Sequence, residues 1–479
     1  MKRSYSDFCL VLITLLMLHV ITRDVSRISV QGQETNYVEY QDTAYTPITD
    51  EESPAGDSIA DVKSLQADME KLQKQLEDLK KTVDTKQNST DTSKKFNCKV
   101  NGLMFIDANF VNQDSENKMR YWDVQNNLGL SDLRIGVKGE GYGILDYNLT
   151  VGLNEDVSLK DAYVGVKNVP YLDYVRFGHF KVESGIGYLT GVFDQNFDAY
   201  DTVSNTFRVG RRVGAGATRL FAGDRIRVFG GIFSREGFDY DTYVNDDCAG
   251  IILNTRITGL PVYREDGDGN LKEVLHCGGC FYWARSDRNI LRLRNQPTTW
   301  YGATGYLLTG TLPANFGSCS VSNLELAWQK DGFGIQSENF VGSYEGYGNA
   351  YGVTLTGRYF LTPGAYITYK KDRGTFSGVH MDKNLQVINL EDRVCFEGWG
   401  ALELIGYWGY TDLDNLRYLP GSVYGSSNEF ITGMNWYWNP QMRVSLNWIH
   451  TIVCSSDSMA AERGESTADT LSLQLRMQY

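Results

Sequence analysis

Proline, long apolar runs and histidine are all scarce in this 479-residue chain. The 9 prolines stand against 49 glycines, 30 tyrosines, 21 phenylalanines and 9 tryptophans, a composition typical of many strands and turns with abundant aromatic side chains. Mean hydropathy is -0.34, which excludes a bundle of membrane-spanning helices but not a membrane barrel, whose strands are only half apolar. The histidines beyond the leader have no neighbouring nucleophile motif, so we expect no enzyme and no cofactor; they are His179, His276, His380 and His450.

The chain also has few basic residues for its length, and its net charge of -13 argues against a nucleic-acid partner. The basic residues are nevertheless concentrated locally. Between Phe207 and Arg235 the sequence carries a run of arginines with a single acid, Asp224; these arginines are 208, 211, 212, 219, 225, 227 and 235. Acids nearby in sequence are too few to neutralise this island.

The N-terminal part predicts export followed by oligomerisation. Lys2 and Arg3 precede the apolar run 8–21, which is too short to span a membrane and suits a secretory signal over residues 1–32; an uncleaved anchor is the alternative. Residues 33–58 predict an acidic flexible tether. Apolar residues then alternate at spacings of three and four from Val62 to Val83, which predicts a coiled coil over 59–86, or else a single docked helix. Residues 87–96 predict a linker.

The segment from Leu471 to Tyr479 alternates strictly between apolar and polar residues and ends on an aromatic residue. A strand places alternate side chains on opposite faces, so one face suits lipid and the other suits water. The same pattern recurs over 145–153, 351–359 and 443–448, the last after a turn at 439–440. We therefore predict an all-β fold over 97–479: a large antiparallel transmembrane β-barrel of about 16 strands, wide enough for an aqueous channel.

The alternation also assigns side chains to the lumen. Around Ile226 both Arg225 and Arg227 are predicted to face inward, and Arg358, Lys370, Arg443 and Arg476 follow by the same rule. Arginine stays charged at any envelope pH and matches the oxygens of phosphate, and rings of Arg or Lys form anion pores. The alternative for any single arginine is a pair with a lumen carboxylate such as Asp146 or Glu403.

The segment from Gly187 to Gly216 lacks a clean period of two before residue 207, which predicts a loop folded inward as a constriction. Here the sequence resembles the phosphate-selective porin O and P family. The matching motifs are Val175-Arg-Phe-Gly-His-Phe-Lys-Val, Tyr188-Leu-Thr, Gly210-Arg-Arg-Val-Gly, Phe396-Glu-Gly-Trp-Gly-Ala-Leu-Glu-Leu, Gly433-Met-Asn-Trp-Tyr-Trp-Asn-Pro and Arg443-Val-Ser-Leu-Asn-Trp-Ile-His-Thr.

The resemblance implies a homotrimer of barrels in the outer-membrane lipid, with an arginine-lined constriction and passive uptake of phosphate or related anions. The predicted anion pathway comprises Arg208, Arg211, Arg212, Arg219, Arg225, Arg227, Arg358, Lys370 and Arg443. The alternatives are a general or sugar-type porin, and a structural outer-membrane protein whose coiled-coil stalk contacts the cell wall.

Two further motifs give only weak indications of a functional site. The run from Asp266 to Asn270 resembles the start of a calcium loop, but its twelfth position is Cys277 where a bidentate Glu is needed, so we expect a plain polar loop and no metal site. Cys277 and Cys280 have CxxC spacing without a second pair, which favours a disulfide in an exposed loop, either between these two cysteines or to another loop.

Overall fold

The computed structural model describes residues 96–479 except 122, 155–156, 235–249, 287–292, 300–306, 309–317, 386, 389–394, 397, 417–422 and 458–463. Residues 97–479 form one compact unit. The predicted signal, tether, coiled coil and linker lie outside the described residues. Among the described residues no helix is long and apolar enough to cross a membrane.

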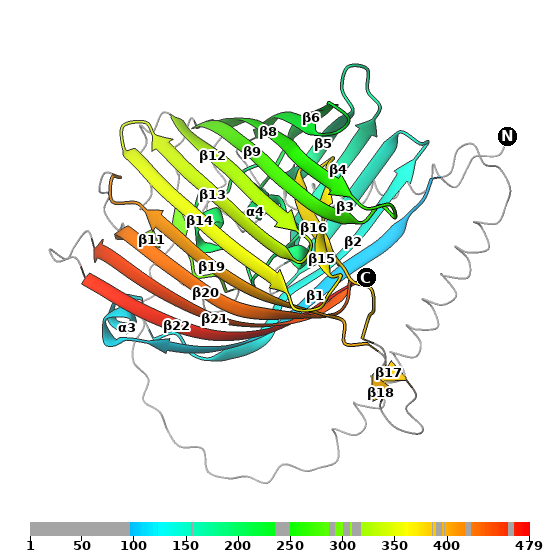
Figure 1. The fold of residues 1–479 in the computed structure, drawn as a ribbon. Coiled ribbons are helices and arrows are strands. Elements are labelled where there is room, and N and C mark those ends of the chain that lie inside the picture. The colour runs from blue at the N-terminus through cyan, green and yellow to red at the C-terminus, as the bar shows by residue number, and fades with distance from the viewer. Residues whose placement is uncertain are drawn as a thin grey trace, which may run out of the picture. The chain divides into compact units, whose positions relative to one another are not determined.

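A closed ring of 16 antiparallel strands forms the wall of this unit (Figure 1). Each strand pairs with the next one in the ring, and the last strand pairs with the first, with Leu103 opposite Gln478. The wall strands are β1 (Lys99–Gln113), β2 (Asn127–Gly141), β3 (Leu145–Leu153), β4 (Val157–Lys167), β5 (Tyr174–Lys181), β6 (Arg211–Phe221), β7 (Ile226–Ser234), β8 (Gly250–Glu265), β9 (Leu271–Ser286), β12 (Ser318–Lys330), β13 (Phe333–Tyr344), β14 (Gly348–Phe360), β19 (Ala401–Asp412), β20 (Val423–Asn439), β21 (Met442–Asp457) and β22 (Gly464–Gln478).

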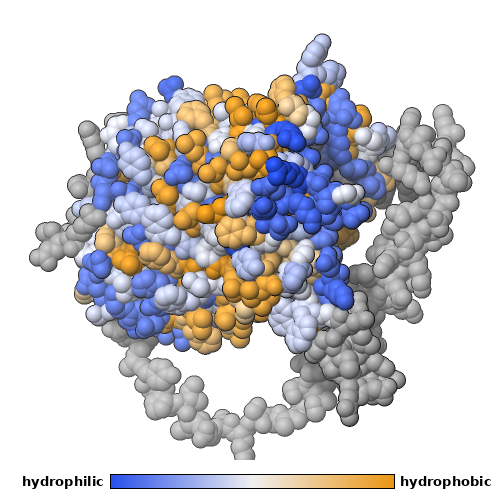
Figure 2. Space-filling model, in the orientation of Figure 1, coloured by the Kyte–Doolittle hydropathy of each residue, from blue (hydrophilic) through white to orange (hydrophobic). Residues whose placement is uncertain are grey.

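The two faces of the wall differ as the alternation predicts. On β22 the side chains of Leu471 and Leu473 are each 45% exposed, whereas Ser472 and Gln474 are fully buried inside. Apolar side chains extend over the outer surface of the wall, where Figure 2 shows them between polar patches. The predicted strands at 145–153, 351–359, 443–448 and 471–479 all belong to this wall, which confirms the barrel.

The connections define two ends of the ring. Short turns such as 142–144, 222–225 and 440–441 share one end with the beginning of β1 and the end of β22; we call this the turn end. The opposite end, the loop end, carries longer connections such as 114–126 and 182–210. In outer-membrane barrels the short turns are periplasmic. The connection 361–400 is the exception, because it is long and lies at the turn end.

Smaller elements lie outside the wall pattern. They are α3 (Ser115–Tyr121), α4 (Ile186–Leu189), η1 (Val192–Asp194), α5 (Thr202–Phe207), β10 (Arg294–Asn295), β11 (Leu307–Leu308), the paired β15 (Tyr366–Lys370) and β16 (Thr375–His380), and the paired β17 (Val387–Ile388) and β18 (Cys395–Phe396). In Figure 1, α4, β15 and β16 are seen within the ring of strands.

The segment 266–270 and the two cysteines with CxxC spacing lie on one hairpin, formed by β8 and β9. The predicted disulfide between Cys277 and Cys280 is wrong, because both are free cysteines of β9. An odd spacing on a strand places two side chains on opposite faces, and accordingly Cys280 is buried beside inner-face groups while Cys277 is partly exposed. In the turn before β9, the Asp266 carboxylate accepts hydrogen bonds from the backbone N–H groups of Asp268 (3.0 Å) and Asn270 (2.8 Å).

Candidate functional site: the barrel lumen

Two segments fold into the ring and narrow it. The first, which we call the inward loop, is the connection 182–210 between β5 and β6, and it contains α4, η1 and α5. The sequence predicted an inward segment over 187–216, but residues 211–216 belong to β6. The loop begins early because β5 has only 8 residues, so the chain leaves the wall before reaching the loop end.

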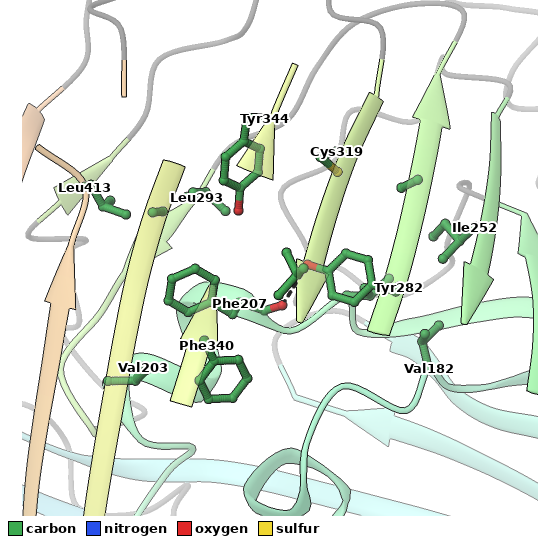
Figure 3. Packing of buried hydrophobic residues seen from close by; sticks show 14 of the residues in the cluster. Val182, Val203, Phe207, Ile252, Tyr282, Leu293, Cys319, Phe340, Tyr344 and Leu413 are labelled. Carbon is green, nitrogen blue, oxygen red and sulfur yellow. Dashed lines mark hydrogen bonds between the residues drawn. The ribbon is translucent and has the colours of Figure 1, made fainter. Parts of the chain in front are cut away.

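The inward loop packs tightly against one side of the wall. The ring of Phe207 stacks on Phe340 of β13, with centroids 5.3 Å apart, and its carbonyl accepts a hydrogen bond of 2.9 Å from the Tyr282 hydroxyl of β9 (Figure 3). Val182 and Val203 are fully buried in the same cluster. On β20, the Glu429 carboxylate accepts from the Thr202 hydroxyl. The loop is therefore a fixed part of the lumen.

Arginines of the last two strands hold the middle of the loop. Arg476 donates from Nη1 to the carbonyls of Val192 (2.9 Å) and Phe193 (3.1 Å), and Arg443 donates from Nη2 to the carbonyl of Gln195 (2.7 Å). Both arginines are fully buried. Arg443 and Arg476 thus donate mainly to carbonyls of the inward loop. These hydrogen bonds hold the two inward-facing cations beneath the loop.

The second inserted segment is the hairpin formed by β15 and β16, residues 366–380, which we call the turn-end hairpin. It enters from the turn end and packs with its own apolar face against the wall; the buried apolar residues are Tyr366, Ile367, Tyr369, Phe376 and Val379. The Tyr369 hydroxyl shares a 2.6 Å hydrogen bond with His276 Nδ1, and Gln329 donates to the carbonyl of Ile367 at 2.7 Å. The sequence analysis did not predict this hairpin.

A chain of buried ion pairs supports the tip of the hairpin. Arg227 forms a bidentate pair with Glu183 (2.6 and 2.8 Å), and Arg256 forms one with Glu325 (2.7 and 2.8 Å). Each arginine also donates to the hairpin: Arg227 Nε to the carbonyl of Asp372 (2.7 Å), and Arg256 Nη2 to that of Gly374 (2.8 Å). Arg227 lies buried on the inner side of β7, and its pair with Glu183 is the carboxylate pairing that the sequence left open as the alternative for a single arginine.

The two segments also touch each other. The Ser377 hydroxyl of the hairpin donates to the Asp194 carboxylate of the inward loop at 3.2 Å. Together the segments cover the wall from β8 round to β22, through contacts with β9, β12, β13, β19, β20 and β21. The inner face from β2 to β6 is where basic side chains collect instead.

Several basic side chains gather on that side of the lumen. We name this group the basic cluster; it comprises Arg134, Arg176, Lys181, Arg208, Arg211 and Arg212. Arg134 pairs with Asp132 (2.5 Å) and Arg211 with Asp161 (3.1 Å). Lys181 donates to the carbonyl of Tyr188 at 2.6 Å, and the guanidinium of Arg208 lies 4.7 Å from the ring centre of Tyr200.

Tyr200 of the inward loop reports the positive potential of the basic cluster. Burial would raise the pKa of its phenol, yet the pKa is lowered because Lys181, Arg211, Arg208 and Arg134 surround it. Opposite charges favour the ionised form of a titratable group.

Arg176 is the member of the cluster that aromatic rings support. Its guanidinium lies 3.9 Å from the ring centre of Phe180 and 5.1 Å from that of Tyr163, a stacking geometry that arginine favours. Its buried Nε has no hydrogen-bond partner among the described residues. Arg358, on the inner face of β14, is similarly buried and lies 5.3 Å from the ring centre of Phe376.

The remaining predicted pathway residues lie at the rim or on the hairpin. Arg225 belongs to the exposed turn before β7, where the strand alternation that placed it in the lumen does not apply. Arg219 shares its parity on β6 with the exposed Val213 and Phe221, and pairs with Asp173 at 3.2 Å. Lys370 lies at the tip of the turn-end hairpin, not on the wall.

Sequence reasoning missed Arg134, Arg176 and Arg256 as lumen cations. The signal for Arg134 and Arg256 was present, because each alternates with apolar neighbours on β2 and β8. It was overlooked because those stretches lack a local excess of arginine. The partners Glu183 and Glu325 lie far away in the sequence and could not be assigned without the fold.

An apolar outer face, a polar inner face and two inward segments define a membrane channel of the porin class. The family model of phosphate-selective porin O and P matches residues 99–479, so the chain belongs to this family and is an outer-membrane protein. No curated protein matches the chain in sequence.

Several solved structures of outer-membrane proteins are similar in fold. OmpT of Vibrio cholerae is 12% identical with a TM-score of 0.45, over 80% of this chain and 99% of that one. DcaP, an outer-membrane channel of Acinetobacter baumannii, is 10% identical with a TM-score of 0.45, over 82% and 99%. An anion-selective porin from Comamonas acidovorans is 9% identical with a TM-score of 0.45, over 80% and 100%. The family assignment depends on the family model and not on these similarities.

Proposed function

We propose that this porin conducts small anions, phosphate-like oxyanions among them, by passive diffusion without catalysis. The observation that carries the proposal is the gathering of cations around Tyr200, where Arg208 and Lys181 lie 4.7 and 5.1 Å from its ring centre and the charges of Arg211 and Arg134 also act on it. Weak binding to several cations along a lumen favours anions and still lets them leave. The family name points to the same class of solute.

The arrangement of the cluster fits oxyanions in particular. Arg208 and Lys181 lie beside the rings of Tyr188 and Tyr200, with cation-to-ring distances from 4.6 to 5.5 Å. Guanidinium groups supported from one side by rings keep N–H donors on their edges, and those donors match the oxygens of phosphate. Conduction of neutral sugars is the rival function; for it the aromatic rings would be the binding groups.

Ion selectivity in planar bilayers tests the proposal. In a KCl gradient the reversal potential of the wild-type channel should have the sign of anion preference, and added inorganic phosphate should reduce the chloride current. Arg208→Glu should lower the anion-to-cation permeability ratio by about five-fold, because it reverses a charge inside the cluster. Arg219→Glu is the matched control at the rim and should change the ratio little. A wild-type channel that prefers cations, or ignores charge, contradicts the proposal.

We also propose that the chain assembles as a homotrimer through its predicted coiled coil. Deletion of residues 59–84 tests this role. Three heptads are marginal alone and gain stability when other contacts already join the chains. The deletion should lower the fraction of trimers that survive native electrophoresis in detergent. Trimers that persist undiminished would show that the heptads are dispensable for assembly and leave a cell-wall contact as their role.

A further inference from the structure

Two carboxylates meet inside the ring without a basic partner. Glu338, on the inner face of β13, is 1% exposed, and its carboxylate accepts hydrogen bonds from the backbone N–H of Gly187 (2.9 Å) and from Asn323 Nδ2 (2.8 Å). Asp201 precedes α5 in the inward loop, and its Oδ1 accepts from the backbone N–H of Ser204 at 2.8 Å. Within the described part of the chain, no basic side chain donates to either carboxylate.

Three oxygen atoms from separate parts of the chain converge beside Gly187 of α4. The atoms nearest to a Cβ built on this glycine are Glu338 Oε2 at 2.6 Å, Ser204 Oγ at 3.1 Å and Asp201 Oδ2 at 3.5 Å. The three oxygens therefore surround one point, at the junction of α4, α5 and β13. A side chain at position 187 would displace the Glu338 carboxylate, so glycine is the residue that keeps the oxygens together.

The Ser204 hydroxyl is the feature that points to a ligand. Ser204 is 2% exposed, and its Oγ makes no hydrogen bond of normal geometry to any residue that the structure describes. A buried hydroxyl without a partner costs stability, and two neighbouring carboxylates with no cation between them repel each other. A cation held by the three oxygens would remove both costs at once.

We propose that Glu338, Asp201 and Ser204 form a binding site for a divalent cation, for which Ca²⁺ is the best match. Carboxylate and hydroxyl oxygens are the ligands of hard cations, and Ca²⁺ accepts irregular geometry and completes its shell with water. Among the described residues no three His, Cys, Asp or Glu side chains gather into a metal site, so neutral oxygens supply the other ligands. Asp201 is partly exposed, which leaves that side open to water of the lumen.

The bound ion joins the inward loop to the wall. Asp201 and Ser204 belong to the loop, whereas Glu338 belongs to β13. The apolar contact beside them follows the same direction, because Phe207 of α5 stacks on Phe340, two residues along β13 from Glu338 (Figure 3). The ion also offsets the negative charge that the two carboxylates bring into the lumen. The inference is independent of the proposed function, since cation binding at this site does not depend on which solutes pass.

Calcium titration of the full-length protein tests the site. Protein refolded in detergent without lipopolysaccharide and stripped with EDTA should unfold at higher urea concentrations as CaCl₂ is added at constant ionic strength, because a ligand of the folded state stabilises it. Asp201→Asn keeps the oxygen that caps α5 and removes the charge, so it should weaken the apparent Ca²⁺ affinity by about 100-fold. Asp266→Asn, in the turn 266–270, is the matched control and should bind Ca²⁺ as wild type does.

Ser204→Ala gives independent evidence, because it removes a ligand without changing the charge. It should weaken the apparent Ca²⁺ affinity by about ten-fold. Heat-dependent migration in detergent gels establishes that each variant is folded. A wild-type protein whose urea midpoint does not respond to Ca²⁺ overturns the site, and so does an affinity that is the same in wild type and in either variant.

A proton shared by the two carboxylates is the rival occupant. Burial raises the pKa of the Asp201 carboxyl, so the group holds a proton more readily than an ordinary aspartate. A shared proton predicts a stability that ignores Ca²⁺ and falls as the pH rises above the usual carboxyl range. Urea midpoints measured over that range in EDTA and in CaCl₂ separate the two occupants, and a pH dependence without a Ca²⁺ dependence overturns the cation site.

Discussion

Arginines of β7, β8, β21 and β22 lie under the two inserted segments, where they bond to carboxylates and backbone carbonyls. Those of β2, β5 and β6 lie on the other side, beside aromatic rings and the carboxylates of Asp132 and Asp161. The first group holds the two inserted segments in place, and the second is the group to which we assign the positive potential of the proposed anion path. The surroundings of a lumen arginine, and not its direction alone, decide its role.

The first group should show the largest effects. Arg476→Gln removes charge-assisted hydrogen bonds to the loop carbonyls of Val192 and Phe193, and each such bond contributes about 1.5–3 kcal/mol. We expect the free energy of unfolding to fall by about 4 kcal/mol, and single-channel conductance to rise because the loop is released. Urea unfolding and bilayer recordings measure the two effects. Arg358 is also buried but donates to no carbonyl of the inward loop among the described contacts. Arg358→Gln should therefore leave the conductance nearly unchanged.

Variants of the buried Glu183–Arg227 pair test whether its two charges stabilise the fold as a unit. Among the described residues, Arg227→Met leaves the Glu183 carboxylate with the longer contact of 3.6 Å to Arg256. Breaking a buried pair typically costs about 3–5 kcal/mol. The double variant Arg227→Met/Glu183→Met removes both charges and should lose less stability than either single variant. A complete double-mutant cycle in urea measures the coupling. Strictly additive losses would show that the pair is not a unit.

Tyr200 gives the basic cluster a pH dependence of its own. Because the surrounding cations lower the pKa of its phenol, raising the pH should ionise Tyr200 before an ordinary tyrosine and place a negative charge inside the cluster. Anion preference should therefore decline as the pH rises toward 10, the ordinary tyrosine value. Reversal potentials recorded over that range check this, with Tyr200→Phe as the control in which the decline disappears. An identical decline in both channels would assign it to other groups.

The smallest effect is expected at the rim. Arg219 and Asp173 are each about 40% exposed (41% and 40%), and exposed ion pairs contribute about 0–1 kcal/mol. Arg219→Gln should change the free energy of unfolding by less than about 0.5 kcal/mol and leave selectivity as in wild type. A strong effect of this variant on selectivity would place Arg219 on the ion path. It would contradict the expectation that residues of the basic cluster affect selectivity and residues of the rim do not.

Most of the wall could be predicted from the sequence, because a period of two is a local property that each strand shows by itself. The strand Leu145–Leu153 was recognised from its own alternation, and the face of Arg227 followed from its neighbours. The same rule failed at Arg225, which lies one residue before β7 begins. Arg219 was predicted from the local excess of arginine and not by this rule, and its parity on β6 gives the outer face.

The inserted segments were harder, because their positions depend on contacts between distant parts of the chain. The irregular pattern after Gly187 indicated an inward loop, but the turn-end hairpin at 366–380 has ordinary strand alternation and could have been taken for wall. Only its pairing distinguishes it, since β15 and β16 bond to each other and to no wall strand among the described ladders. Likewise Glu183 and Glu325, which pair with Arg227 and Arg256, lie far from them in the sequence and meet them only in the fold.

The pairing of β1 with β22 has a consequence for folding. Arg476 lies 284 residues after Val192, whose carbonyl it binds, so the strand that closes the ring also carries a group that fixes the constriction. Contacts between such distant residues form late and slowly. Until β22 docks, the ring has two unpaired edges and the inward loop lacks the anchor that Arg476 provides. Closure of the barrel therefore also completes the seating of the inward loop.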